Sequence, residues 1–236
     1  MKTIGIIGGM SWESTAVYYQ LINRGVKEKL GGMHSAKLIL NSVDFAEIES
    51  LQSSGDWQSA GRLLNECCKS LKSAGADVIL IATNTMHKVT DHIMKDVDLP
   101  LIHIVDPTAL ALKSNGHTSV GLLGTKFTMQ EPFFKERMLH QHGIDVLVPS
   151  DADQDDIHRI IFNELCLGEI SETSRALFLN IIGRLATQGA SAVVLGCTEI
   201  GLLIQQNQTQ TPLFDTTQLH AESAVDFATH QESLSQ

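Results

Sequence analysis

Short apolar runs alternate with amphipathic stretches along the whole 236-residue chain, and this alternation limits the fold more than any other feature. Continuous apolar runs predict buried strands of parallel sheets, and the stretches between them predict helices that cover both faces of such sheets. The expected strands are residues 3–7, 37–42, 78–82, 101–105, 119–123, 145–148, 192–196 and 212–214, and the main expected helices are 13–28, 57–73, 154–166 and 173–188. We therefore expect an α/β protein with its site at the carboxyl ends of the strands.

Three segments recur in the same order about 110 residues apart, which indicates an internal duplication. The matching pairs are Gly5–Gly9 with Gly121–Thr125, Ile79–Thr85 with Val193–Glu199, and His103–Thr108 with Pro212–Thr217. This pattern predicts two similar α/β lobes, the first from residues 1–104 plus 212–236 and the second from residues 105–211. Two such lobes would form one cleft between them, where substrate sites are common.

Composition excludes several classes of function. The net charge is −10 and no Lys/Arg cluster forms a stripe, so nothing indicates nucleic-acid binding. No apolar run reaches the roughly 18 residues of a membrane span, and the apolar segment near the N-terminus is too short for a secretory signal. The four cysteines lack CxxC spacing, so the sequence predicts neither zinc nor a disulfide framework. A small-molecule enzyme of the cytoplasm fits these features.

Two polar loops follow expected strands in the first lobe. Gly8–Thr15 opens a helix, and its glycines and helix N-terminus could receive a substrate carboxylate; a tight turn with Ser11 as helix cap explains it equally well. It lacks the spacing of dinucleotide and P-loop sites. Thr83-Asn84-Thr85 could orient a small polar ligand, although helix capping alone also accounts for these three residues.

A third loop carries the most reactive candidate. Gly196-Cys197-Thr198-Glu199 follows an apolar strand and precedes a helical pattern. A cysteine in the first turn of a helix has a lowered thiol pKa, so we expect Cys197 to be reactive, whereas most buried cysteines only fill space. Cys166 lies at an expected helix end before Gly168 and is expected to serve packing. Of ten histidines, His87 alone falls beside a candidate loop.

These loops resemble the aspartate/glutamate racemase family over nearly the whole chain. Gly196–Leu203 is similar to the second signature of that family, and Ala82–His87 is similar to the first, with Thr83 where the family has a cysteine. Gly8–Thr15 and Ser42–Phe45 match the aspartate racemase branch.

The resemblance implies two pseudo-twofold related lobes, no pyridoxal phosphate, no metal and no other cofactor, and dimerisation. It also implies two bases that flank the substrate Cα, one removing the proton and the other returning one to the opposite face. The positions equivalent to these bases are Thr83 and Cys197. The implied substrate-binding residues are Met10, Gln52, Asn84, Thr85, Thr125, Thr198 and Glu199.

Thr83 breaks the symmetry of such a site. A threonine alkoxide does not form near neutral pH, so Thr83 is a poor base, but its hydroxyl could return a proton that another group resupplies. The resemblance implies that Cys197 serves the L enantiomer, so we expect efficient attack by Cys197 on L substrates and poor attack on D substrates. Gln52 and Cys166 stand where aspartate-selective relatives hold the side-chain carboxylate with basic residues. Aspartate or glutamate remains the first expectation, with homoserine as an extension.

Other functions stay open from the sequence alone. A single-cysteine decarboxylase or a cis–trans isomerase of the same superfamily could share the lobes and Cys197. A catalytically weak protein that only binds an amino acid would also suit Thr83. The pairs Asn84-Thr85 and Thr198-Glu199 favour amino acids, because Glu199 gives a substrate ammonium a partner.

Overall fold

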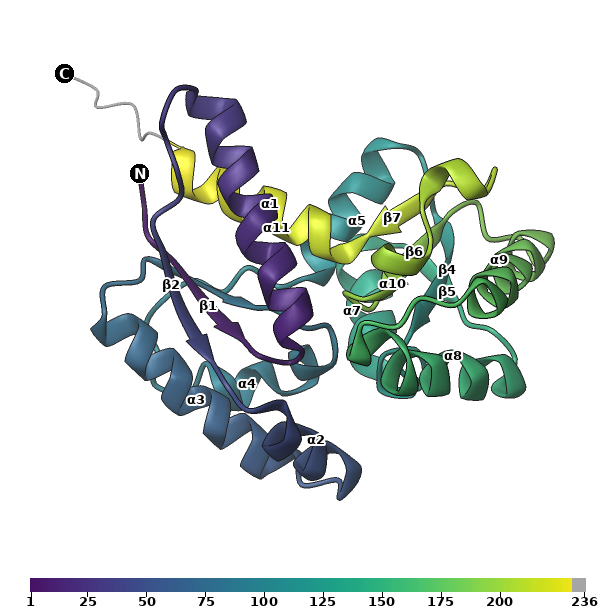
Figure 1. Ribbon diagram of the computed structural model, residues 1–236, viewed down its shortest axis with the longest axis horizontal. Helices are drawn as coiled ribbons and strands as arrows, with labels where there is room; N and C mark the ends of the chain where they lie inside the picture. The colour runs from purple at the N-terminus through teal and green to yellow at the C-terminus, as the bar shows by residue number, and fades with distance from the viewer. Residues whose placement is uncertain (231–236) are drawn as a thin grey trace. The chain divides into compact units, whose positions relative to one another are not determined.

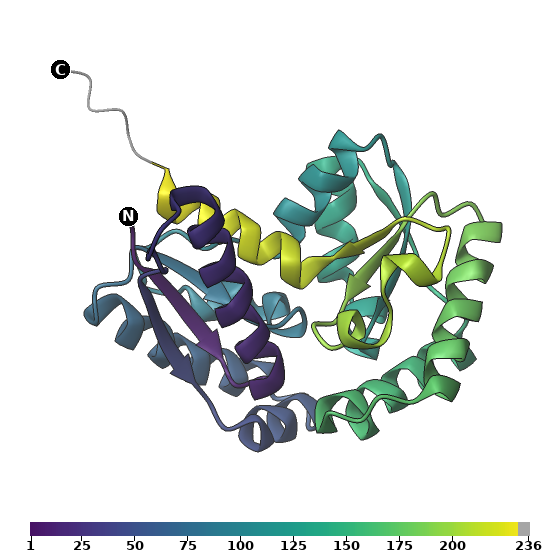
Figure 2. The ribbon, with the colours of Figure 1, turned by 45° about the horizontal axis from the view of Figure 1, so that its top comes forward.

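The computed structural model describes residues 1–230 and divides into two compact units (Figures 1 and 2). Unit 1 comprises residues 1–103 and continues from His220, and unit 2 comprises residues 104–219. No helix of the described residues is long and apolar enough to cross a membrane.

Unit 1 is built on a parallel sheet with the order β2-β1-β3. Its elements are β1 (Ile4–Gly8), α1 (Trp12–Leu30), β2 (Leu38–Ser42), α2 (Phe45–Ser53), α3 (Trp57–Ser73), β3 (Val78–Ile81), the 3₁₀ turn η1 (Thr85–Val89) and α4 (Thr90–Ile93). Helix α11 (Thr216–Thr229) begins in unit 2, and from His220 onward it belongs to unit 1.

Alternate strand residues of unit 1 enter opposite halves of its core, as the twofold repeat of a strand requires. Ile4 and Ile6 pack with Tyr18 of α1 and Val225 of α11, whereas Ile7 packs with residues of α2, α3 and α4. The sheet is therefore covered on both faces, which explains why its strands read as continuous apolar runs. Figure 1 shows α1 and α11 on one side of β1 and β2, with α3 on the other.

Unit 2 is built on a parallel sheet with the order β5-β4-β6-β7. Its elements are α5 (Val105–Ser114), β4 (Ser119–Gly124), α6 (Lys126–Gln130), α7 (Pro132–His142), β5 (Asp145–Leu147), α8 (Asp151–Asn163), η2 (Leu165–Leu167), α9 (Glu172–Thr187), β6 (Val193–Gly196), α10 (Ile200–Leu203), η3 (Gln206–Gln208) and β7 (Leu213–Asp215). Its core is one continuous apolar cluster. Figure 2 shows the teal helices α5 and α7 on one side of this sheet and the green helices α8 and α9 on the other.

The α/β class and the parallel sheets flanked by helices are confirmed, but one expected strand is wrong. Residues 101–105 form no strand: Leu101 makes one isolated parallel bridge with Ile79, and α5 begins at Val105. The early start of α5 leaves too few extended residues for a ladder. Both sheets still share one order, because Leu101 lies beside β3 as β7 lies beside β6.

The segment 212–219 lies in a different unit from the one expected. The internal duplication predicts that it belongs to the first lobe, whereas β7 pairs with β6 in the sheet of unit 2. The hydrogen bond from Val193 N to Pro212 O begins this pairing. The chain therefore returns to unit 1 only at His220, within α11.

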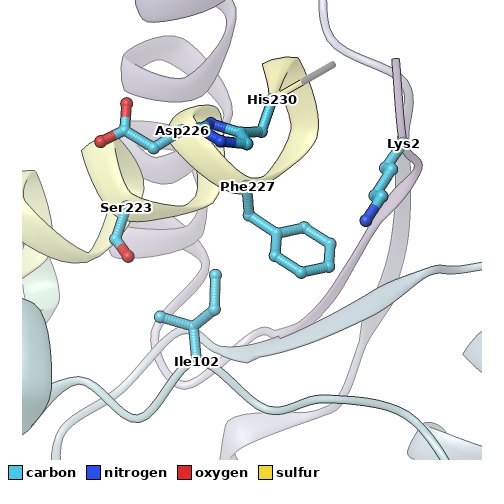
Figure 3. Close-up of a pocket in the computed structure, with 6 residues that line it drawn as sticks. All are labelled: Lys2, Ile102, Ser223, Asp226, Phe227 and His230. Carbon is cyan, nitrogen blue, oxygen red and sulfur yellow. The ribbon is translucent and has the colours of Figure 1, made fainter. Parts of the chain in front are cut away.

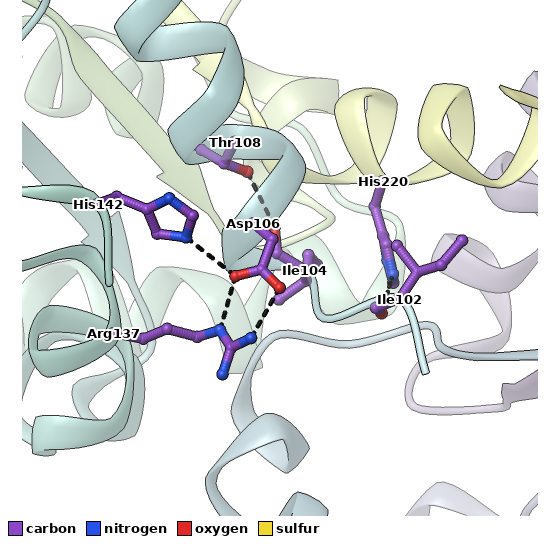
Figure 4. Close-up of polar contacts among 7 residues, drawn as sticks. All are labelled: Ile102, Ile104, Asp106, Thr108, Arg137, His142 and His220. Carbon is purple, nitrogen blue, oxygen red and sulfur yellow. Dashed lines mark hydrogen bonds and ion pairs between the residues drawn. The ribbon is translucent and has the colours of Figure 1, made fainter. Parts of the chain in front are cut away.

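An ion pair ties α5 to α7 inside unit 2 (Figure 4). Arg137 donates from both Nε and a terminal nitrogen to the two oxygens of Asp106, each at 2.7 Å, and His142 Nε2 lies 3.0 Å from Asp106 Oδ1. Burial raises the pKa of Asp106, but the hydrogen bonds from Arg137 and His142 outweigh it, so the pKa is lowered from 3.8. Two parallel charge-assisted bonds in a half-buried setting are stronger than an exposed ion pair.

We predict that Asp106→Asn lowers the free energy of unfolding by about 1–2 kcal/mol at neutral pH, because it weakens a partly screened bidentate pair. Urea denaturation measures this change. Since the folded pKa is lowered, the difference from wild type is full above pH 3.8 and shrinks as the pH falls through the folded pKa. Asp156→Asn is the control, because its pair with Arg159 is exposed and should change stability by no more than about 0.5 kcal/mol. Equal losses in both variants would contradict the assignment.

Candidate functional site

Unit 1 brings two of the candidate loops to one edge of its sheet. Strands β1 and β3 are parallel neighbours with Ile7 opposite Ile81, and Ala82 N donates to Ile7 O at 2.9 Å. The loops that follow these strands, which carry Met10 and Thr83, therefore start side by side. Met10 and Asn84 are buried.

Gln52 reaches the same region from α2. Its side-chain amide donates to Met86 Sδ at 3.1 Å, and Met86 lies in η1 directly after Thr85. Both Gln52 and Thr85 are buried. The predicted residues Met10, Gln52, Thr83, Asn84 and Thr85 thus belong to one end of unit 1.

The glycine loop of unit 1 is a tight turn with a helix cap. Gly9 has φ +91°, and a Cβ there would lie 2.2 Å from Val43 O, so no other residue fits. Ser11 caps α1, because its hydroxyl accepts from Ser14 N at 3.3 Å. Thr15 Oγ1 accepts from Gly9 N and donates to Ser11 O. These contacts agree with the second interpretation of the loop, a tight turn with Ser11 as the helix cap.

Unit 2 places Thr125 and Cys197 at equivalent positions on neighbouring strands. Gly124 of β4 is opposite Gly196 of β6, and Thr125 and Cys197 are the next residues. A Cβ on Gly124 would lie 2.9 Å from Gly196 O, so the glycines let the two strand ends approach closely. Thr125 is buried and caps α6 through a bond from Thr128 N.

The buried carboxylate of Glu199 accepts hydrogen bonds from the hydroxyl of Thr198 and the thiol of Cys197. Cys197 Sγ donates to Glu199 Oε2 at 3.0 Å, and Thr198 Oγ1 donates to the same oxygen at 2.7 Å. Glu199 is 2% exposed and Cys197 is 7% exposed. A carboxylate next to a thiol is a direct acceptor for the thiol proton, so this arrangement can exchange protons without solvent.

The pKa of Cys197 differs from the sequence-based expectation. Burial raises it well above 9.0, and the charges of Glu199 and Cys166 raise it further. The expected lowering by a helix N-terminus is wrong for the ligand-free protein, because α10 begins only at Ile200 and has four residues. Cys197 therefore holds its proton until something changes the charge around it.

Cys166 was expected from the sequence to serve packing, and the structure shows how it relates to Cys197. It lies in η2 rather than at the end of a continuous helix, because α8 stops at Asn163. It packs against the core cluster that contains Cys197 and acts electrostatically on that thiol. The sequence signal was only a cysteine before Gly168, which adopts the left-handed conformation that ends the turn.

Thr83 is half-buried, and both of its backbone polar groups are bonded within unit 1. Its N–H donates to Ile81 O at 2.8 Å, and its carbonyl lies 2.9 Å from His87 Nδ1. A threonine hydroxyl can donate a proton but does not ionise near neutral pH, so Thr83 and Cys197 are chemically unequal.

A separate pocket of about 380 Å³ in unit 1 contains none of the candidate residues. Figure 3 shows it at the last turns of α11, with the Lys2 side chain directed toward the Phe227 ring. Lys2 Nζ lies 4.6 Å from the centroid of that ring. The described residues contain no group of three or more His, Cys, Asp and Glu side chains that could hold a metal ion.

The chain is similar to known racemases over almost its whole length. Residues 7–224 match the model of the Asp/Glu/hydantoin racemase family. A solved structure of a Yersinia pestis protein assigned as an Asp/Glu racemase is 53% identical, covers 98% of this chain and 100% of its own, and has a TM-score of 0.91. An aspartate racemase homologue from Pyrococcus horikoshii is 33% identical with the same coverage and a TM-score of 0.85. A broad-specificity amino-acid racemase of Bacillus subtilis is 24% identical over 66% of each chain.

The chain therefore belongs to the Asp/Glu/hydantoin racemase family. The expected resemblance to this family is confirmed, and so is the expected activity class, an isomerase that acts as an amino-acid racemase.

We predict that Glu199→Gln lowers the pKa of Cys197 in the ligand-free protein, because it removes a negative charge that raises this pKa. The pH midpoint of Cys197 alkylation, followed by site-resolved mass spectrometry, should move down. Glu136→Gln removes one charge from the exposed face of α7 and is the matched control, with an unchanged midpoint. A midpoint that rises or stays fixed in Glu199→Gln would contradict the electrostatic assignment.

Proposed function

We propose that this enzyme racemises a small amino acid without a cofactor, with Cys197 as the base that removes the α-proton of the L enantiomer. The observation that carries this proposal is the hydrogen bond from the Cys197 thiol to the buried Glu199 carboxylate. Glu199 also gives the substrate ammonium an anionic partner. Thr198, Asn84, Thr85 and Thr125 supply further hydrogen bonds to the substrate, and Met10 and Gln52 complete the set.

Substrate binding activates the thiol in this proposal. An ammonium beside Glu199 offsets the carboxylate charge that raises the pKa of Cys197, so the thiol proton can leave to the carboxylate. The thiolate then takes the α-proton and becomes a thiol, and the electron pair stays on the substrate as a carbanion. Hydrogen-bond donors and exclusion of water stabilise this carbanion in place of a cofactor.

Thr83 returns a proton to the opposite face of the carbanion in this proposal. Its alkoxide must be reprotonated at once by another group or by water. Glu199 releases the proton that it took from the thiol, so that both residues return to their starting states. The reaction therefore starts well from L substrates and poorly from D substrates. Since free enantiomers have equal energies, a bias in kcat must be matched by a bias in KM.

The substrate class in this proposal is aspartate and glutamate, extending to homoserine. Gln52 is neutral, and the basic residues next to the candidate residues have other partners. Lys126 pairs with Asp155, and Lys88 lies over the Trp57 ring at 4.0 Å. Because both of these cations already have partners, we expect neutral polar side chains to be accepted as well as carboxylates. The four cysteines are free thiols, which agrees with the cytoplasm as the site of action.

We predict that incubation in deuterated buffer with L-aspartate, L-glutamate or L-homoserine gives α-deuterated D-product from at least one of them. Loss of the α-proton begins every turnover and solvent supplies the returned one, so label enters only through the reaction. Chiral chromatography with mass spectrometry measures D-product and label in recovered L-substrate separately.

Two variants separate the roles of Cys197 and Thr83 in this experiment. Cys197→Ala should abolish both signals, because no base remains for the L face. Thr83→Ala should keep exchange in recovered L-substrate and lower D-product by about 100-fold, the ordinary contribution of a positioned proton donor. Binding without exchange for all three substrates would favour an amino-acid-binding role. Equal kcat values for L and D enantiomers would contradict the asymmetric roles.

We propose further that the enzyme is a homodimer joined through an uncharged surface of unit 1. A shallow groove of about 370 Å³ lies between α1 and β2, and its lining residues carry no formal charge. They include exposed Trp12, Tyr19 and Leu40. Two copies with a net charge of −10 each repel least where neither presents a charge. Exposed apolar surface of this kind supports contact with another copy.

We predict that the wild type sediments as a dimer and that Leu40→Lys shifts it toward the monomer, because the variant places a charge within the contact. Sedimentation velocity over a concentration series measures the change. Leu139→Lys is the matched control, because Leu139 is comparably exposed on α7 and should leave the dimer intact. A monomeric wild type at all concentrations would rule out this surface as a dimer contact.

A further inference from the structure

Three histidines gather in the core of unit 1 behind the loop that carries Thr83. His87 is 2% exposed, His103 8% and His220 0%. The His87 ring lies 4.6 Å from that of His103 and 5.8 Å from that of His220, between ring centroids, both in edge-on arrangements. His87 lies in η1, His103 in the segment between α4 and α5, and His220 in α11. The proposed chemistry uses none of them.

Hydrogen bonds to carbonyl groups define which ring nitrogens carry protons. His87 Nδ1 lies 2.9 Å from Thr83 O, so this nitrogen donates. His220 Nε2 donates to Ile102 O at 2.8 Å (Figure 4), which leaves its Nδ1 to accept from Tyr18 Oη at 2.9 Å. These bonds therefore define the tautomers of His87 and His220.

The His87 ring stays neutral near pH 7 because of its surroundings. Burial lowers the pKa of His87 well below 6.5, and the neighbouring His103 and His220 lower it further. Backbone carbonyls of Thr83 and Asn84 act in the opposite direction without reversing the shift. The charged residues nearest in sequence are Lys88, the next residue of η1, and Asp91 in α4. His87 is thus a neutral donor with a fixed tautomer.

The cluster also lies where the chain leaves and re-enters unit 1. His103 is the last residue before unit 2, and His220 is the first residue after it. His87 contacts both rings and bonds the carbonyl of Thr83. The backbone of Thr83 is thereby held from both sides, since its N–H is bonded to Ile81 O. Loss of the His87 bond would free the peptide after Thr83 to rotate.

We propose that His87 is a positioning residue that fixes the backbone of Thr83 and so aims its hydroxyl at the substrate. The inference rests on the proposed function, in which Thr83 returns the proton. His87 touches neither substrate nor reacting atoms and acts only through the Thr83 carbonyl. A displacement of about 1 Å in a reacting group can cost on the order of 100-fold in rate, so a single backbone bond is sufficient to matter.

The position of the donor nitrogen provides a sharp test. The amide nitrogen of asparagine is attached to Cγ, as Nδ1 of histidine is, whereas the amide nitrogen of glutamine lies one bond further out, nearer the place of Nε2. His87→Asn therefore keeps a donor for Thr83 O, and His87→Gln and His87→Ala do not. The deuterated-buffer assay gives the ratio of D-product to labelled L-substrate, which reports the Thr83 face separately from the Cys197 face.

We predict that His87→Ala and His87→Gln lower this ratio about tenfold or more, while labelling of L-substrate by Cys197 continues. His87→Asn should restore most of the ratio. Tyr18→Phe is the control for a general loss of stability in the cluster, because it removes a buried hydrogen bond of the same cluster without touching Thr83. It should lower the melting temperature and leave the ratio unchanged.

Four outcomes distinguish the possibilities. Equal ratios in wild type and His87→Ala, with both folded by circular dichroism, would overturn the positioning role. A ratio that falls equally in Tyr18→Phe, or that His87→Asn does not restore, would make the cluster a packing element only. Absence of any label in the wild type would instead be a failure of the proposed function, which this experiment distinguishes from a failure of His87.

Discussion

The parallel pairing of β1 with β3, and of β4 with β6, is the constraint on which the candidate site depends. Each pair ends in register, so the loop after one strand begins beside the loop after the other. In unit 2 this pairing favours glycine at both strand ends, because a Cβ on Gly124 would lie 2.9 Å from Gly196 O and one on Gly196 would lie 2.7 Å from the Leu122 side chain. The polar residues that follow are close together as a consequence of strand register, although they are far apart in the sequence.

Burial gives Cys197 two opposite properties. Exclusion of water favours the protonated thiol in the free enzyme, and the Glu199 carboxylate adds to this preference. The same exclusion strengthens every charge interaction that a bound ammonium would make there. A thiol that ionises only with substrate present is protected from oxidants and alkylating agents between turnovers, because the thiolate is the reactive form.

Much of the fold could be predicted from sequence, because apolar runs and glycine turns are local signals. The prediction of a strand at residues 101–105 was wrong because these residues suit either a strand or the start of a helix, and α5 begins at Val105. The predicted direction of the Cys197 pKa shift was also wrong. The shift depends on burial and on the position of the Glu199 side chain, and both are determined by the tertiary fold. The cluster of His87, His103 and His220 gave no local signal at all, because its members lie far apart along the chain.

The two halves of a duplicated chain need not carry equal chemistry. Thr83 follows β3 as Cys197 follows β6, yet their supports differ: a neutral histidine holds the Thr83 carbonyl, and a carboxylate receives the Cys197 proton. A base needs an acceptor for its proton before it can act, so a carboxylate partner suits Cys197. A residue that only donates a proton needs orientation rather than ionisation, and a rigid backbone supplies it. The difference between the two partners therefore agrees with a division of labour in which one half removes the proton and the other returns it.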